Sequence, residues 1–223
     1  MVEINGYMER LLGLLREKFG ERLAYVGLQG SYSRGEAAED SDVDVMVLLE
    51  DFSVDDMQSY RALLDQMGDT DRACGFLCGR EEMANWNPLE ICHLLHTTRD
   101  YYGELNGLVS AYTRENVRDY IRLSLGNLYH VLCHTRVHAG EAEMRTLLPA
   151  AYKQAFFILQ NLCFYHTGCF PGTRRELRTM LDGADRAVLQ REMERRGTGD
   201  WNTHGDLRLL FDWCRDTLNR FKE

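Results

Sequence analysis

The 223-residue sequence is 44% hydrophobic and 27% charged, a composition that can bury a core and form one large or two small domains. Its formal net charge of −9 and its pI of about 5.3 argue against a broad electrostatic grip on nucleic acid and permit attraction of a cationic small molecule. No apolar run approaches the roughly 20 residues that a membrane span requires, and the first residues lack the order of a signal peptide. We therefore expect a cytoplasmic protein with no membrane association.

Cysteine usage indicates reduced thiols. The seven cysteines are odd in number, scattered, and mostly set within apolar runs: Cys74, Cys78, Cys92, Cys133, Cys163, Cys169 and Cys214. Cys74 and Cys78 have the spacing of a zinc half-site, but no second pair of matching form accompanies them. On a strand both would simply face the same side.

The chain begins with a predicted helix followed by two predicted strands. Apolar residues recur at helical spacing from Ile4 to Phe19, and Gly20 is a typical stop, so we expect a helix that packs on a sheet. Residues 22–29 are apolar and β-compatible and predict the first strand. Residues 42–49 predict the second strand, which is apolar on both faces except at its first turn.

Two carboxylates open the second strand. Because side chains of a strand alternate between its faces, Asp42 and Asp44 should project from one face, about 6.5 to 7 Å apart along the backbone. Carboxylates this close repel each other unless a cation lies between them. Mg²⁺ binds through one or two carboxylates and completes its octahedron with water and substrate phosphates. We therefore predict that Asp42 and Asp44 are catalytic Mg²⁺ ligands.

The turn after the first strand has the composition of a phosphate-binding site. Gly30 lets the backbone approach a ligand closely, and Ser31 adds a hydroxyl to the free amide donors. Arg34 has two interpretations: it pairs with phosphate, or it organises the acidic loop that follows it. That loop contains Glu36, Glu39 and Asp40.

The residues of the turn, the loop and the strand start occur in a set order between two predicted strands. The combined pattern is far more specific than any single residue in it. The set is Gly30, Ser31, Arg34, Gly35, Ser41, Asp42 and Asp44. It resembles the motif of the nucleotidyltransferase superfamily that includes DNA polymerase β and the antibiotic nucleotidyltransferases. The resemblance implies a two-metal transfer of a nucleoside monophosphate from a nucleoside triphosphate, with ATP as the expected co-substrate, to an acceptor hydroxyl. Pyrophosphate is the implied leaving group.

The resemblance also implies a third carboxylate on a later strand. Ser53 predicts the start of a helix to about Met67. The next segments predict a third strand, a turn of helix, and a fourth strand that follows Pro88 and pairs with the third as a hairpin. They are residues 72–78, 81–86 and 90–96.

The choice of third carboxylate depends on that fourth strand. Its interior offers no acid, so Glu90 at its beginning is the first candidate for a catalytic role. Glu81, Glu82 and Asp100 rank behind it. If none of them reaches the metals, Asp42 and Asp44 would act with the substrate alone and activity would be weak or lost.

Beyond Gly107 the sequence predicts helices only. Five segments have helical spacing, and Pro149 is tolerable only in the first turn of the second of them. They are residues 114–137, 147–166, 173–181, 184–195 and 203–221. We thus expect an α+β protein: a small mixed-sheet nucleotidyltransferase domain at residues 1–107, followed by an all-α helical bundle domain at residues 108–223.

The second half resembles the helical domains that accompany kanamycin-type nucleotidyltransferases, in helix pattern and in residues 164–177. Lys153 lies within an apolar helix and must extend to solvent or meet an anion. The resemblance implies that it binds the triphosphate; the alternative is a solvent-facing position on a narrow polar stripe. His130, His134 and His138 recur every fourth residue. We interpret them as solvated, since no carboxylate accompanies them in metal-binding geometry.

Two classes of function follow. The first is an enzyme that transfers a nucleoside monophosphate to a hydroxyl of a small acceptor, such as an aminoglycoside or lincosamide antibiotic, and the acidic balance of the chain suits a polycationic acceptor. The second is an antitoxin-like nucleotidyltransferase or nucleotide-binding module that acts on a protein partner. A homodimer is compatible with either class.

Overall fold

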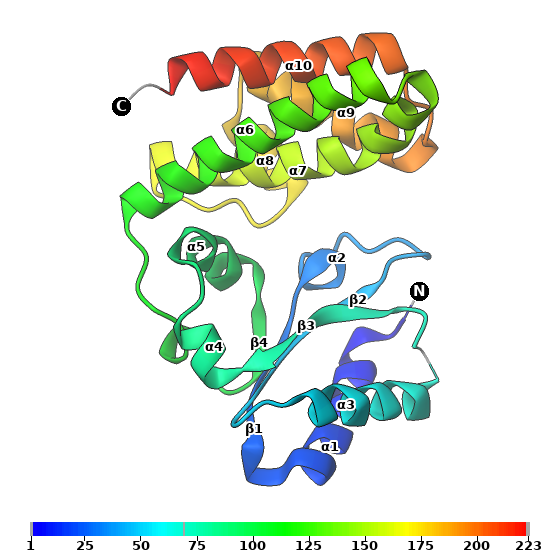
Figure 1. Cartoon of the computed structure of the whole chain (residues 1–223), viewed down its shortest axis with the longest axis vertical. Coiled ribbons are helices and arrows are strands. Elements are labelled where there is room, and N and C mark those ends of the chain that lie inside the picture. Colours follow the sequence, from blue (N-terminus) through cyan, green and yellow to red (C-terminus); the bar gives the residue numbers. More distant parts are fainter. Residues whose placement is uncertain (1, 69, 222–223) are drawn as a thin grey trace. The chain divides into compact units, whose positions relative to one another are not determined.

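The computed structural model describes residues 2–68 and 70–221, which divide into two compact units, the first ending at Tyr112 and the second beginning at Thr113. The division falls a few residues after the expected boundary at Gly107. The first unit combines a four-stranded sheet with helices, and the described part of the second contains helices and loops (Figure 1). The predicted α+β class is confirmed.

The first unit is built on a mixed sheet with the strand order β3-β2-β1-β4. Its elements are α1 (Ile4–Phe19), the 3₁₀ turn η1 (Gly20–Arg22), β1 (Leu23–Leu28), α2 (Gly30–Ser33), β2 (Val43–Leu49), α3 (Val54–Met67), β3 (Ala73–Gly79), α4 (Arg80–Ala84), α5 (Pro88–Thr97), β4 (Arg99–Tyr102) and the 3₁₀ turn η2 (Leu105–Gly107). Strand β1 is antiparallel to β2 and to β4, whereas β2 and β3 are parallel. Helix α3 makes the crossover that a parallel pair requires.

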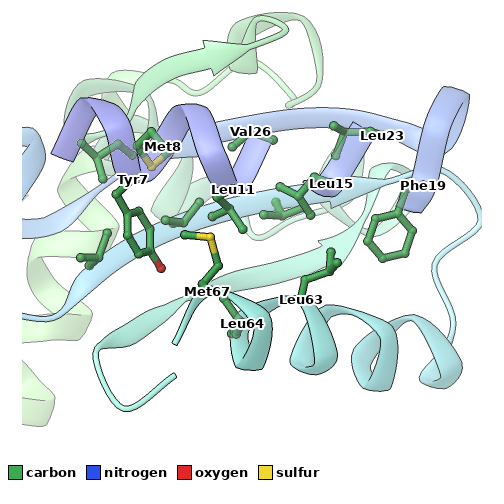
Figure 2. Packing of buried hydrophobic residues seen from close by; sticks show 14 of the residues in the cluster. Tyr7, Met8, Leu11, Leu15, Phe19, Leu23, Val26, Leu63, Leu64 and Met67 are labelled. Carbon is green, nitrogen blue, oxygen red and sulfur yellow. The ribbon is translucent and has the colours of Figure 1, made fainter. Parts of the chain in front are cut away.

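Helices α1 and α3 cover one face of the sheet (Figures 1 and 2). The predicted periodicity of α1 is confirmed, because Met8, Leu11 and Leu15 are fully buried against the sheet. Each such side chain contributes about 1.5 to 3 kcal/mol of transfer free energy. Ser53 and Asp56 form a capping box at the start of α3, as the sequence predicts.

The opposite face of the sheet is covered by a second core. Its strand residues alternate along the chain with the strand residues of the first core. Met46 and Leu48 of β2 are fully buried there, together with Tyr25 of β1 and Met83 of α4. Leu94 and Leu95 of α5 pack against the same cluster. Because side chains alternate along β2, Asp44 belongs to this second face.

The predicted fourth strand at residues 90–96, and its hairpin with the third strand, are wrong. These residues lie in helix α5, whose first residue is Pro88. The Asn87 side chain caps the helix by accepting a hydrogen bond from Leu89 N at 3.1 Å. Proline suits the first helical position because its missing N–H would have no partner there, and asparagine is a favoured cap. The fourth strand of the sheet is instead β4, which pairs with β1.

The second unit is organised around α7. Its helices are α6 (Arg114–His138), α7 (Glu141–Thr167), α8 (Arg174–Met180), α9 (Gly183–Thr198) and α10 (Thr203–Arg220). Helix α7 contacts each of the other four and buries residues along most of its length. None of the described helices of the chain combines the length and apolar character needed to span a membrane.

Pro149 departs from its predicted place. Helix α7 begins at Glu141, so Pro149 lies inside the helix rather than in its first turn. An interior proline costs about 3 kcal/mol, since it removes one hydrogen bond and crowds the preceding turn. Met144 and Leu148, just before and within that turn, are fully buried, and each contributes about 1.5 to 3 kcal/mol. Packing therefore outweighs the local cost.

Residues 164–177, which carry the second resemblance, end in a buried ion pair. Arg174 at the start of α8 donates two hydrogen bonds of 2.7 Å to Glu192 of α9, and both side chains are at least nine-tenths buried. The Arg174 guanidinium also lies 4.0 Å from the centroid of the Phe156 ring on α7. The Arg174 guanidinium thus contacts residues of two other helices. Removing Arg174 or Glu192 would leave the other charge buried and unpaired, which would lower the free energy of unfolding by about 3 to 5 kcal/mol.

Candidate active site

The site is built at the start of β2. Asp42 directly precedes the strand and is exposed, whereas Asp44 is its second residue and is half-buried. Val43 and Val45, which alternate with them, are buried in the core beneath α1 and α3. This alternation places both carboxylates on the sheet face away from that core.

Gly30 is fixed by the carboxylate of Asp44. Its φ of +66° belongs to the left-handed region, and a methyl group in place of its hydrogen would lie 1.8 Å from Asp44 Oδ2 and 2.6 Å from Cγ. The backbone N–H of Gln29 donates to the Asp44 carbonyl at 2.8 Å. Only glycine fits this position, and the turn and the strand hold each other in place.

Ser31 lies in the single helical turn α2, directly after Gly30. The carbonyl of Gln29 accepts from Ser33 N at 3.3 Å, and that of Ser31 accepts from Glu36 N at 2.9 Å. Ser31 itself is half-buried. The predicted phosphate-binding turn therefore has a defined backbone, and the role of Ser31 stays a prediction.

The environment of Arg34 favours the loop-organising interpretation. Arg34 Nε lies 3.3 Å from Glu36 Oε2, and the two side chains are only 8% and 16% exposed. A guanidinium held this way has lost most of its hydration and is fixed by its carboxylate partner. Whether it also meets phosphate stays a prediction.

Helix α5 approaches the turn from the other side. The Gln29 side chain donates from Nε2 to Thr98 Oγ1 at 2.8 Å, which joins the end of β1 to the end of α5. Burial, together with the Arg34 charge, lowers the pKa of His93 to about 4. His93 is therefore a neutral imidazole beside the motif at physiological pH. A strand at residues 90–96 would not account for this neighbourhood, because it is the position of His93 on α5 that brings it toward Arg34.

None of the carboxylates considered as third ligand lies beside Asp44 in the sheet. Glu90 is exposed on the first turn of α5 and accepts from Trp86 Nε1 at 2.7 Å. Asp100 lies on β4, opposite Gly27, and accepts from the Tyr25 hydroxyl at 2.5 Å. Burial and this hydrogen bond raise the pKa of Tyr25 above its ordinary value. The other two candidates, Glu81 and Glu82, lie on α4. The catalytic role of Glu90 stays a prediction.

Cys74 occupies the place beside Asp44. The two residues are register partners in the parallel pair of β2 and β3, so their side chains share a face. Partial burial of the thiol and the Asp44 charge raise the pKa of Cys74. β3 passes so close here that a methyl group on Gly75, whose φ is +149°, would lie 2.0 Å from the Val45 carbonyl oxygen. Although Cys74 stands in an apolar run of the sequence, it is exposed.

The donor set fits a hard cation held partly by its substrate. Among the described residues, no group of three or more His, Cys, Asp or Glu side chains is arranged to hold a metal ion. Asp42 and Asp44 supply two carboxylates, which is the number that Mg²⁺ takes from a protein when substrate phosphates provide the other ligands.

Lys153 belongs to the second unit. It lies on α7, where its neighbours Ala151 and Tyr152 are buried while Lys153 itself is exposed. This is the polar position on an apolar helix that the sequence analysis described. Its contact with a triphosphate stays a prediction.

The motif lies within the part of the chain that matches a known protein family. Residues 8–76 match the family model described as a nucleotidyltransferase domain. Protein adenylyltransferase MntA of Thermococcus cleftensis is 60% identical over 37 residues, which cover 17% of this chain and 35% of that protein. The matched stretch thus spans only about a third of the relative's length.

Among solved structures, spectinomycin adenyltransferase AAD(9) from Enterococcus faecialis, with ATP and spectinomycin, aligns over 96% of this chain and 99% of its own. The TM-score is 0.61 and the identity 13%, so this likeness is one of fold. A structure of a toxin-antitoxin with AMP-PNP covers 58% of this chain and 92% of its own at 17% identity, but its TM-score of 0.34 supports no inference. The motif and the family model together identify residues 8–76 as a nucleotidyltransferase domain, and the chain shares its fold with a solved adenyltransferase.

Proposed function

We propose that this chain transfers a nucleoside monophosphate from a nucleoside triphosphate, with ATP as the expected donor, to a hydroxyl group of a small acceptor in the cytoplasm. The observation that carries the proposal is the contact of Gly30 with the Asp44 carboxylate. It joins the turn expected to bind phosphate to the strand end expected to bind metal. The turn and the strand end are then positioned relative to each other by this one close approach of the backbone.

Asp42 and Asp44 would hold Mg²⁺. When bound, the metal would offset the negative charge of the triphosphate and polarise its α-phosphate. Gly30 and Ser31 would place backbone amides and a hydroxyl near the β- and γ-phosphates. Such positioning and electrostatics supply most of the catalysis in phosphoryl transfer.

The reaction is an in-line displacement at the α-phosphorus. The acceptor oxygen forms the new bond to phosphorus, the bond to the bridging oxygen of the β-phosphate breaks, and pyrophosphate leaves with the electron pair. The hydroxyl proton must pass to a base, and we retain Glu90 as the candidate for this role because it is exposed. A Glu90→Gln variant with unchanged turnover would show that another group or water takes the proton.

The acidic charge of the chain supports a small, cationic acceptor of the aminoglycoside type. The fold shared with the spectinomycin adenyltransferase over nearly the whole chain adds support of a general kind. No partner nucleic acid is expected at a net charge of −9.

A protein acceptor is the second candidate. It is favoured by one observation, the 60% identity over 37 residues to a relative named as a protein adenylyltransferase. In that case the same residues would act on the donor, and the acceptor would be a hydroxyl-bearing side chain of a partner protein. A homodimer is compatible with both candidates.

One experiment separates these outcomes. The purified chain is incubated with Mg²⁺, each of the four labelled ribonucleoside triphosphates, and either a panel of hydroxylated antibiotics or a cell extract. Pyrophosphate release and the labelled product are then measured. Label on a small molecule supports the first candidate, and label on a protein band supports the second. If an Asp42→Asn, Asp44→Asn double variant releases as much pyrophosphate as the parent, the proposed site is wrong.

A further inference from the structure

A row of three histidines on α6 is not used by the proposed function. His130, His134 and His138 are all exposed. In an α-helix, residues four apart lie on neighbouring turns, about 6 Å apart along the axis, so the three form one stripe. Successive rings are tilted against each other, with centroids 5.9 Å apart for His130 and His134, and 4.8 Å apart for His134 and His138.

Ring separation tells which pair can share a metal ion. Imidazole binds Zn²⁺ through a ring nitrogen at about 2.0 to 2.1 Å, which places the metal about 3.2 Å from the ring centroid. Two rings on one metal then have centroids about 4.5 Å apart at a right angle and about 5.2 Å apart at the tetrahedral angle. The 4.8 Å between His134 and His138 falls within this interval.

The other pair does not meet this criterion. A centroid separation of 5.9 Å would require an angle of about 135° at the metal, which is wider than tetrahedral coordination allows. His130 therefore lies next to the chelating pair rather than in it. Both pairs have the four-residue spacing by which zinc peptidase motifs bind their metal, so the ring separation is what distinguishes them.

The end of the helix favours a cation at the same place. Helix α6 ends at His138, so His134 and His138 lie in its last turns. The unpaired carbonyl groups there give the helix end a partial negative charge that stabilises cations. The net charge of −9 acts in the same direction at longer range.

We propose that His134 and His138 form a surface site for a transition metal ion that prefers imidazole, such as Zn²⁺, Ni²⁺ or Cu²⁺. Its nitrogen ligands distinguish it from the oxygen ligands offered by Asp42 and Asp44, because hard Mg²⁺ prefers oxygen. No third His, Cys, Asp or Glu ligand completes the set within the described chain. Water would fill the remaining coordination positions, and the site would bind reversibly.

Calorimetric titration of the whole protein with NiCl₂ tests the site, in a buffer that contains excess Mg²⁺ and a non-thiol reductant. We expect one equivalent to bind to the parent protein. His134→Ala and His138→Ala should each lower the affinity at least tenfold, whereas His130→Ala should change it less than threefold. His204→Ala is the matched control, because His204 is also an exposed histidine on a helix, and it should leave binding unchanged.

Exposed thiols are the main competing ligands. A Cys74→Ser, Cys169→Ser variant removes the two exposed cysteines and should retain the Ni²⁺ equivalent. Circular dichroism of each variant without metal shows whether it is folded. The proposal is overturned if folded His134→Ala and His138→Ala bind Ni²⁺ like the parent, if the cysteine variant loses the equivalent, or if His204→Ala loses as much affinity as they do.

Discussion

Gly30→Ala is the sharpest test of the candidate active site, because the chain supplies a matched control. Gly30 and Gly35 have nearly the same backbone conformation, with φ of +66° and +68°. Alanine in the left-handed region costs about 1 to 2 kcal/mol at either position. The surroundings differ: a methyl group on Gly35 meets nothing within 4 Å, whereas one on Gly30 lies 1.8 Å from Asp44 Oδ2.

The difference in turnover between the two variants measures the effect of moving the Asp44 carboxylate. A carbon and an oxygen atom approach to about 3.3 Å, so the carboxylate must move by about 1.5 Å. Misplacement of a catalytic group by about 1 Å can reduce the rate about 100-fold. We expect Gly30→Ala to lose at least that factor in turnover, and Gly35→Ala to stay within about threefold of the parent once the shared loss of stability is taken into account.

Initial rates of pyrophosphate release at saturating ATP and Mg²⁺ measure the first effect, and thermal unfolding followed by circular dichroism measures the second. Gly35→Ala should unfold somewhat below the parent protein because of its backbone conformation, and Gly30→Ala should unfold lower still because it also displaces Asp44. The reasoning fails if Gly30→Ala turns over at the parental rate, or if Gly35→Ala loses activity to the same extent.

Three further predictions concern single carboxylates and the thiol beside them. Asp42→Asn and Asp44→Asn should each abolish Mg²⁺-dependent turnover with little loss of thermal stability, and parental rates in both would move the metal site elsewhere. Cys74→Asp adds a carboxylate beside Asp44 and should raise turnover about 10- to 100-fold; a folded variant no faster than the parent would contradict this. Arg22 and Ser53 hold the pKa of Asp56 well below its usual range, so its contribution to stability is present above about pH 4 and is lost as the pH falls. Asp56→Asn should therefore lower the unfolding temperature more at pH 7 than near pH 2, and an equal loss at both would refute the assignment.

The elements that the sequence predicted correctly are those with a local signal. Helix α1 is defined by apolar residues at helical spacing and by Gly20 at its end. Helix α3 is defined by Ser53 at its start and Gly68 in the left-handed region at its end. Each signal lies within a few residues of the element that it specifies, so a single sequence contains all that is needed.

Helix α5 was missed although its signal is local. Pro88 can restart an extended segment, but here the pair Asn87 and Pro88 forms a cap and a first helical residue. Ile91 and Cys92 are buried while Leu94 and Leu95 pack on the second core, a spacing that suits a helix as well as a short apolar strand. The preference of Asn-Pro for helix starts would have decided between the two.

The neighbour of Asp44 could not be predicted from local signals, because it depends on strand pairing. Asp44 and Cys74 are partners in the parallel pair of β2 and β3, and they lie 30 positions apart in the sequence. The whole of α3 lies between them in the chain. A shift of the register by one residue would place Gly75 there instead and turn Cys74 to the other face. Residue type alone gave no reason to choose a cysteine.

The strand order limits which residues can support the two aspartates. In the described sheet, strand β2 lies between β1 and β3, and the residues beside Asp44 are Gln29, which follows β1 directly, and Cys74 of β3. Asp100 is separated from β2 by β1 and is bound by the Tyr25 hydroxyl. If two carboxylates are all that the protein offers, the phosphates must supply the remaining charged ligands. Mg²⁺ should then bind weakly to the free protein and much more tightly in the presence of the triphosphate, so that metal and nucleotide enter the site as one complex.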